Sequence, residues 1–152
     1  MSSLRNRLFQ SWFRFRRPMT LGVRGLVLRQ DGQVLLVRHT YVPGLFFPGG
    51  GVEKAETVET ALSRELREEA GVALQADPVL AGVFSNHLNF PNDHVILFRV
   101  TAEAWMPCPA DNSGEIAELV WCDPAAPPED ATSGTRRRLA EHVAGRAGSG
   151  HW

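Results

Sequence analysis

Three glutamates between positions 65 and 69 have a spacing that suits metal-dependent chemistry. Glu65, Glu68 and Glu69 stand at positions i, i+3 and i+4, so a helix there places all three carboxylates on one face. Like charges at that spacing repel each other, and a divalent cation would relieve the repulsion. Oxygen ligands without His or Cys suit Mg²⁺ or Mn²⁺, which commonly contact substrate phosphates. The alternative is a solvated helix face, on which Arg64 pairs with Glu68.

The residues around these glutamates favour the metal-binding interpretation. The segment satisfies the pattern G-x5-E-x7-R-E-U-x-E-E-x-G-U, in which U is aliphatic. From average residue frequencies, the chance of a match at one starting point is below about 10⁻⁸. The pattern is the Nudix box, and the sequence resembles a Nudix hydrolase over roughly residues 20 to 145. The fixed positions are Gly50, Glu56, Arg64, Glu65, Leu66, Glu68, Glu69, Gly71 and Val72.

The resemblance implies an α+β fold, in which an α/β/α sandwich contains a mixed sheet and carries the box helix on one face. It also implies Mg²⁺- or Mn²⁺-dependent hydrolysis of a phosphoanhydride bond in a nucleoside diphosphate linked to another moiety. Two alternatives stay open: a Nudix-like module that binds a nucleotide without turnover, and an RNA 5′-pyrophosphohydrolase with a basic substrate channel. The expected partner is a small nucleotide derivative rather than nucleic acid, and a homodimer is one expectation for the oligomeric state.

The match to the family's box also implies roles for single residues. Glu65 and Glu69 correspond to the main metal ligands, and Glu68 to a third ligand or a water activator. A carbonyl at Gly50, or just before it, is expected to reach the metal. Arg64 is expected to orient the neighbouring carboxylates. The general base is left open between the box and a later loop.

Further candidates for the site lie outside the box. Glu115 enters a predicted strand where related enzymes often place another acidic ligand or base, although an ordinary exposed loop acid is the alternative. Arg24, Arg38 and His39 lie on the first predicted hairpin, where they could hold a phosphate or a base. Phe46 and Phe47 could stack on a nucleobase, although aromatic residues beside a core loop more often pack against their neighbours.

The elements that must position these residues follow from apolar periodicity and turn signals. The strands 20–29 and 34–40 flank an Asp-Gly turn and are predicted to form a β-hairpin. The box helix is predicted over residues 57–70, with Gly71 as its stop. Further strands are predicted at 79–86, 94–103 and 116–121, and a second helix at 135–144 with Arg136 to Arg138 on its exposed side. This order implies a mixed sheet covered by helices on both faces.

Composition limits the broad class of the protein. The 152 residues are 43% hydrophobic and 22% charged, as in a single globular domain. A net charge of −1 gives no overall field that favours nucleic acid or an anionic membrane. Cys108 and Cys122 lack the spacing of a zinc site or a disulfide framework, so a reducing cytoplasm is the expected compartment. No apolar stretch is long enough for a transmembrane helix.

The predicted domain, residues 20–145, has a segment on either side of it. Residues 1–19 form a basic amphipathic segment with five arginines and no acid. It is expected to dock on the domain or on a partner subunit, with membrane or nucleic-acid contact and a mobile tail as alternatives. Residues 146–152 are expected to form a flexible tail.

Overall fold

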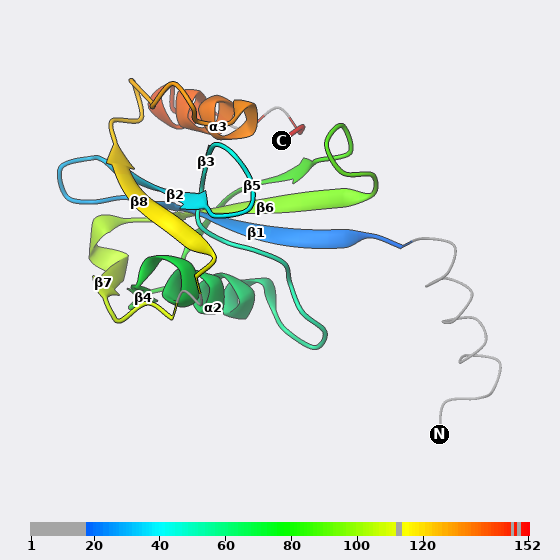
Figure 1. Ribbon diagram of the computed structural model, residues 1–152, viewed down its shortest axis with the longest axis horizontal. Helices are drawn as coiled ribbons and strands as arrows, with labels where there is room; N and C mark the ends of the chain where they lie inside the picture. The colour runs from blue at the N-terminus through cyan, green and yellow to red at the C-terminus, as the bar shows by residue number, and fades with distance from the viewer. Residues whose placement is uncertain (1–17, 112–113, 147, 149) are drawn as a thin grey trace.

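The computed structural model describes residues 18–111, 114–146, 148 and 150–152, so most of the basic segment predicted at 1–19 lies outside the described residues. Two helices, α2 (Val58–Ala70) and α3 (Ser133–Val143), lie on opposite sides of the strands (Figure 1). The strands are β1 (Thr20–Val27), β2 (Val34–His39), β3 (Leu45–Phe46), β4 (Val72–Leu74), β5 (Val79–Ser85), β6 (Asp93–Val100), β7 (Trp105–Pro107) and β8 (Ile116–Cys122). The predicted α+β sandwich, with the box helix on one face, is confirmed.

The strands form three small sheets. The first has the order β1-β6-β5, the second β3-β2-β8, and the third β4-β7. β1 runs parallel to β6, with Thr20 opposite Asp93 and Val27 opposite Val100, and every other strand pair is antiparallel. The mixture of parallel and antiparallel pairs agrees with the predicted mixed sheet.

The predicted hairpin between the first two strands is wrong in its pairing, although both strands exist. The turn forms, since the Arg29 N–H donates to the Gln33 carbonyl at 2.9 Å and Leu28 makes an isolated antiparallel bridge with Val34. Beyond that bridge the strands separate, and β1 pairs with β6 while β2 pairs with β3 and β8. An Asp-Gly turn signal is local, so it cannot predict a strand partner that lies far along the chain.

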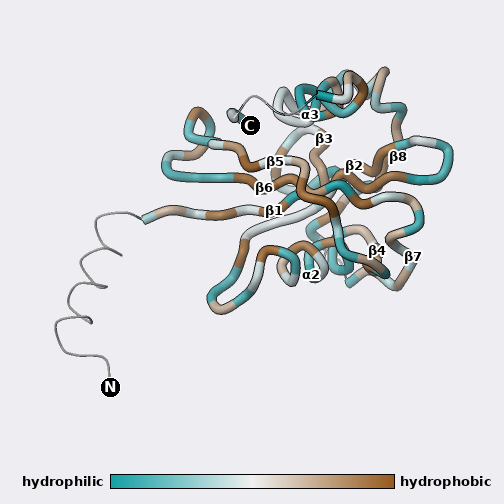
Figure 2. Tube along the Cα trace, turned by 180° about the vertical axis from the view of Figure 1, so that it is seen from behind, coloured by the Kyte–Doolittle hydropathy of each residue, from teal (hydrophilic) through white to brown (hydrophobic). Residues whose placement is uncertain are grey.

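Each central strand contributes side chains to two cores, because successive side chains point to opposite faces. Val23 and Leu35 pack beneath α2 with Leu62, and Leu26 and Leu36 belong to the cluster that includes Leu139 of α3. Figure 2 shows the hydrophobic residues concentrated along the strands in the middle of the molecule. Burial on both faces therefore fixes the strands between the two helices.

The box helix begins and ends as predicted. The Thr57 side chain caps its start by accepting a hydrogen bond from the Thr60 N–H at 3.2 Å. Gly71 ends it with a φ of 62°, and the Gly71 N–H donates to the Arg67 carbonyl at 3.2 Å. A side chain at this left-handed position would be strained, which explains the glycine. These local signals position the box glutamates.

The second half of the chain differs from prediction in three places. Residues 102–104 form a short 3-10 helix, so the strand predicted to reach residue 103 ends at Val100. The short strands β4 and β7, which pair with each other, were not predicted. The predicted flexible tail instead includes a docked end, since the Trp152 N–H donates to the Ser85 carbonyl at 3.0 Å.

Candidate active site

A glycine turn between β1 and α2 forms the base of the candidate site. β1 holds it in place, because the Val23 N–H donates to the Gly50 carbonyl at 2.8 Å and the Gly25 N–H donates to the Pro48 carbonyl at 2.9 Å. The Arg24 guanidinium, from the same strand, donates to the Gly49 carbonyl. The backbone at 48–50 is therefore fixed by neighbouring residues of one strand.

Glu69 is the most buried carboxylate of the box. It is 8% exposed, and its Oε2 accepts a hydrogen bond from the Gly49 N–H at 2.8 Å. Burial raises the pKa of Glu69 to about 7, opposed by the Gly49 hydrogen bond and by the charge of Arg24. Glu65 and Glu115 raise the pKa further by repulsion. A carboxylate in these surroundings is stabilised in its charged form by a nearby cation.

Glu65, one helical turn before Glu69, lies against the same glycine turn. A Cβ atom added at Gly50 would stand 2.4 Å from Oε1 of Glu65, so the carboxylate occupies the space that a side chain would fill. The absence of a side chain at position 50 therefore permits the close approach. Glu65 and Glu69 thus both adjoin the Gly49–Gly50 backbone.

Arg64 joins the remaining acids of the box into one network. Its Nε donates to Glu56 at 3.0 Å, and its Nη1 lies 2.8 Å from Glu65 and 3.4 Å from Glu68. The guanidinium also donates to the Gly51 carbonyl at 3.1 Å, which ties the helix to the glycine loop. The hydrogen bond from Arg64 lowers the pKa of Glu56. Arg64 is therefore placed to orient carboxylates.

The donor set fits a hard divalent cation. Over the described ranges, no group of three His, Cys, Asp or Glu side chains is close enough to form a complete metal site. The reason lies in the contacts above: Glu65 and Glu68 pair with Arg64, and Glu69 bonds to Gly49. Glu65 and Glu69 nevertheless present carboxylate oxygens beside one turn, and oxygen ligands are what Mg²⁺ or Mn²⁺ prefers. The Gly50 carbonyl keeps a second lone pair beyond its bond from Val23.

Two of the candidates from outside the box also approach Glu69, and the charge of a third, Glu115, acts on it. Arg24 contacts the turn, and His39, which is 7% exposed, places its Nδ1 3.8 Å from Oε1 of Glu69. Glu115 precedes β8, and its charge acts on both Glu69 and His39. Exposed Tyr41 stacks near His39, with ring centroids 5.1 Å apart, and was not singled out from the sequence.

Two other candidates lie elsewhere. Arg38 is engaged on the surface, with its guanidinium 2.9 Å from Glu118 and within ion-pair distance of Asp130. Phe47 is fully buried in the core beneath α3, so its ring has no surface for stacking on a base. The structure therefore does not bring Arg38 or Phe47 to the box glutamates.

A cavity of about 480 Å³ opens beside the glycine turn. Its size is within the range of small-molecule sites. The sequence did not predict that the start of α3 and Trp152 line this cavity. The Thr132 cap is a local signal for the start of the helix. No local pattern indicates that the tryptophan at position 152 lines a cavity. The cavity is lined by Thr20, Leu21, Gly22, Arg24, Phe46, Gly50, Gly51, Asn86, Asn89, Asp93, Val95, Thr132, Ser133, Gly134 and Trp152.

Comparison with known proteins agrees with this geometry. The model of the NUDIX domain family matches residues 18–142. The chain belongs to the Nudix family. A crystal structure of a MutT NUDIX hydrolase from Burkholderia pseudomallei superposes with a TM-score of 0.67 at 27% identity, covering 80% of this Nudix chain and 95% of that one.

Two curated relatives show how far the similarity extends. The 8-oxo-dGTP diphosphatase of Escherichia coli is 29% identical over 98 residues, which are 62% of this Nudix chain and 74% of that protein. The ADP-ribose pyrophosphatase of Methanocaldococcus jannaschii is 40% identical over 73 residues, or 46% of this chain. The matched part spans only 43% of the archaeal protein's length. Among the described residues, no helix has the length and apolar character needed to span a membrane.

Proposed function

We propose that this Nudix chain is a divalent-metal-dependent pyrophosphohydrolase that cleaves a phosphoanhydride bond in a nucleoside diphosphate linked to another moiety. The observation that carries the proposal is the approach of Glu65 and Glu69 to one glycine turn at the edge of the 480 Å³ cavity. Carboxylates that converge next to a cavity of this size suit a phosphorylated substrate and its cation.

Glu65 and Glu69 would hold Mg²⁺ or Mn²⁺, with Glu68 and the Gly50 carbonyl as further ligands. When bound, the cation supplies Lewis acidity and neutralises diphosphate charge. Arg64 fixes Glu65 through the 2.8 Å contact and ties α2 to the Gly51 carbonyl. The protein's own contribution is thus to hold oxygen ligands of the right kind beside the substrate.

Two glutamates are candidates for the general base. The Glu68 side chain is 47% exposed and only loosely held by Arg64, at 3.4 Å, so it can turn toward a water molecule. Glu115 lies in the loop before β8 and acts on the pKa of Glu69 by its charge. Either carboxylate can accept a proton from water once it is within hydrogen-bonding reach of the attacking oxygen.

The cavity supports a nucleotide-sized substrate. Arg24 and Gly50 line the end nearest the glutamates, whereas Phe46, Asn86 and Asn89 line other parts of the wall. An arginine suits a phosphate, and an aromatic ring with amide groups suits a nucleobase. The names of the relatives suggest that ADP-ribose and oxidised nucleoside triphosphates should be tested first.

The deciding experiment is a hydrolysis assay of the purified full chain with Mg²⁺, with Mn²⁺ and with EDTA. ADP-ribose, 8-oxo-dGTP and 5′-triphosphorylated RNA serve as substrates, in water enriched in ¹⁸O, so that mass spectrometry identifies the attacked phosphorus. We expect metal-dependent release of a nucleoside monophosphate, of pyrophosphate, or of both. The double variant Glu65→Gln/Glu69→Gln, prepared identically, controls for contaminating hydrolases.

The same assay separates the alternatives. Release from the RNA alone would assign the chain to RNA 5′-end hydrolysis. A ligand-induced rise in melting temperature with no product from any substrate would overturn the hydrolase proposal in favour of a non-catalytic binding module. Product formation that is equal in the double variant would also overturn it.

A further inference from the structure

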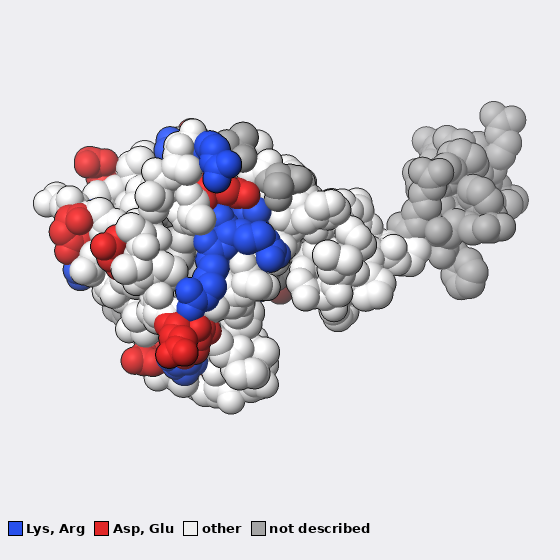
Figure 3. Space-filling model, turned by 90° about the horizontal axis from the view of Figure 1, so that it is seen from above, with Lys and Arg blue, Asp and Glu red and all other residues white. Residues whose placement is uncertain are grey.

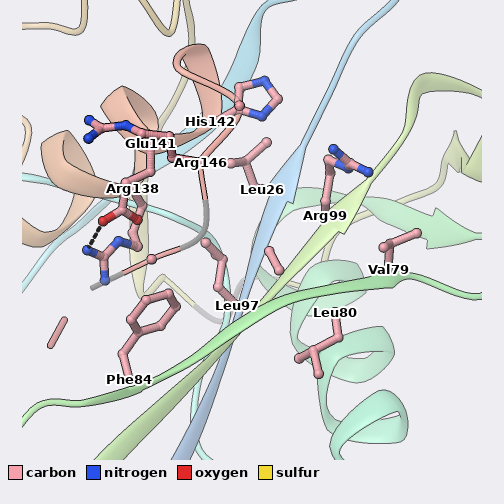
Figure 4. A pocket seen from close by; sticks show the side chains of 13 residues that line it. Leu26, Val79, Leu80, Phe84, Leu97, Arg99, Arg138, Glu141, His142 and Arg146 are labelled. Atoms are coloured by element: carbon pink, nitrogen blue, oxygen red, sulfur yellow. Dashed lines mark hydrogen bonds and ion pairs between the residues drawn. The ribbon is translucent and has the colours of Figure 1, made fainter. Parts of the chain in front are cut away.

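A second cavity, of about 280 Å³, lies between α3 and the strands β5 and β6 (Figure 4). It shares no lining residue with the cavity beside the glycine turn. The two are separated by a wall in which the rings of Phe84 and Trp152 lie 5.8 Å apart; Phe84 faces the second cavity and Trp152 the first. The second cavity is therefore a separate place on the molecule.

Two exposed arginines line the mouth of this cavity from different elements. Arg99 of β6 and Arg146, which follows α3, are both exposed, and neither forms an ion pair with an acid among the residues described. His142 lies beside them, and its pKa is lowered by burial and by the charge of Arg99. Among the described residues that line the cavity, Glu141 is the only acid, and it pairs with Arg138 at 2.7 Å.

Arg138 carries this positive charge into the floor of the cavity. Its side chain is fully buried, contrary to the sequence prediction that it lies on the exposed side of α3. The guanidinium stacks 4.0 Å above the Phe84 ring and donates to the His151 carbonyl at 2.7 Å, while its buried Nε has no hydrogen-bond partner. A buried donor without a partner is costly.

Much of the remaining lining of the cavity is apolar. Leu26, Leu97 and Phe84 form buried parts of its wall. Val79 and Leu80, on the edge strand β5, line its rim with 49% and 57% of their surface exposed. Figure 4 shows Arg138 and Arg146 on the α3 side of the space, whereas Arg99 lies on the strand side with Val79 and Leu80. Exposed apolar residues beside unpaired arginines are typical of a ligand-binding surface.

Basic side chains also occur on the face of the molecule that carries α3. Figure 3 shows Lys and Arg side chains in a short band across this face, with acidic side chains next to both ends of the band. Such a band raises the local concentration of anions near the cavity. The volume of about 280 Å³ is close to the lower limit for small-molecule sites, which favours a small ligand.

We propose that this cavity binds a small organic phosphate with a flat, largely apolar body, of the class of a nucleoside monophosphate. The phosphate contacts Arg99 and Arg146 at the mouth, and the flat body lies against Leu80 and Leu97. Arginine forms paired hydrogen bonds with phosphate oxygens, which gives the site its preference for anions. The proposal does not depend on hydrolysis at the box glutamates, because none of them lines this cavity.

The test is calorimetric titration of the full chain with AMP, adenosine and inorganic phosphate in EDTA, where the metal-dependent site is not loaded. We expect one AMP per chain, with adenosine and phosphate each binding at least about tenfold more weakly. Arg99→Gln/Arg146→Gln should weaken AMP binding at least about tenfold. The matched control Arg29→Gln/Arg67→Gln removes the same charge from the half-buried Arg29 and the exposed Arg67, both outside the cavity, and should change the affinity less than about twofold.

A second variant tests the apolar wall. Leu80→Glu places a carboxylate at an exposed position on the rim, where it repels phosphate without disturbing the core, and should also weaken AMP binding at least about tenfold. The proposal is overturned if AMP does not bind at millimolar concentration. It is equally overturned if AMP binds the Arg99→Gln/Arg146→Gln and Leu80→Glu variants as it binds the natural chain.

Discussion

The two helices carry opposite charge arrangements on opposite sides of the same strands. On the α2 side, Arg64 contacts three glutamates, and the buried Glu69 lies beside them. On the α3 side, Glu141 is the one acid of the second cavity and pairs with the buried Arg138. In each place one side chain of opposite charge pairs with part of the cluster. The other charged side chains of the cluster are available for a ligand. The proposed cation site and the proposed anion site therefore lie on opposite faces of the same strands.

The largest expected effect concerns the buried carboxylate of the α2 side. Glu69→Gln keeps an acceptor for the Gly49 N–H but removes the charge that would hold a metal. We expect kcat/KM for the best substrate to fall at least about a hundredfold. Glu59→Gln, an exposed glutamate on the first turn of the same helix, is the control and should change it less than about twofold. Activity within tenfold of the natural chain in Glu69→Gln would contradict the assignment.

The same residue predicts a pH dependence of stability in the metal-free protein. The pKa of Glu69 is raised from 4.5 to about 7, so the folded chain binds more protons than the unfolded chain between these values. The free energy of unfolding therefore falls as the pH rises through that interval, by about 3 kcal/mol in total. Urea unfolding in EDTA at pH 5 and pH 8 measures the change. Glu69→Gln should lose this contribution and be more stable than the natural chain at pH 8, whereas Glu59→Gln should not.

The arginine that organises the α2 side should matter for both stability and activity. Arg64→Gln leaves Glu56, Glu65 and Glu68 without their shared partner. We expect the free energy of unfolding to fall by about 2 kcal/mol and hydrolysis to fall about tenfold to a hundredfold. Arg67→Gln, an exposed arginine on the same helix, provides the comparison in urea unfolding and in the hydrolysis assay. Equal effects of the two variants would show that Arg64 acts only as a surface charge.

Adjacent glycines allow a finer test of carboxylate placement. Gly50→Ala adds a Cβ 2.4 Å from Oε1 of Glu65, whereas a Cβ at Gly51 would meet nothing within 4 Å. The flexible Glu65 side chain can move aside, so we expect little change in melting temperature for either variant. Hydrolysis should fall about tenfold in Gly50→Ala and stay near the natural rate in Gly51→Ala. Similar rates in the two variants would argue against a role for the position of Glu65.

The smallest expected effect tests whether the α2 side and the α3 side act independently. Arg99→Gln/Arg146→Gln alters the α3-side cavity, which shares no residue with the cavity beside the glutamates. We expect kcat/KM for hydrolysis to change less than about twofold, because separated sites without shared partners behave independently. A larger loss at saturating Mg²⁺ would show that the arginines serve the hydrolytic substrate itself, and the two sides would then be one functional surface.

The features that the sequence predicted correctly are those encoded by neighbouring residues. Thr57 and Gly71 define the ends of α2 by local capping, and the spacing of Glu65 and Glu69 follows from the helical repeat. The pairing of β1 could not be predicted in this way. Its partner β6 is far away in sequence, and the Asp31-Gly32 turn favoured a local hairpin that is limited to one bridge.

The placement of the remaining site candidates depends on which face of a strand is buried. Arg24 and Arg38 both lie on predicted strands, yet only Arg24 reaches the glycine turn, while Arg38 pairs with Glu118 across from it on β8. Phe46 and Phe47 are adjacent and point to different surroundings, so alternation alone decides which of them lines the cavity. Likewise, nothing local to Trp152 indicates that it closes a wall against Phe84.

The parallel pairing of β1 with β6 has a consequence for how the chain folds during synthesis. Thr20 and Asp93 are 73 positions apart, so their strands can meet only after the whole box helix has left the ribosome. α2 can form early from its own caps, but the turn at Gly50 acquires its bond from Val23 only when β1 is in place. Closing so long a loop is slow compared with local helix formation. Assembly of the acidic centre should therefore be among the last events of refolding, well after helical signal has appeared.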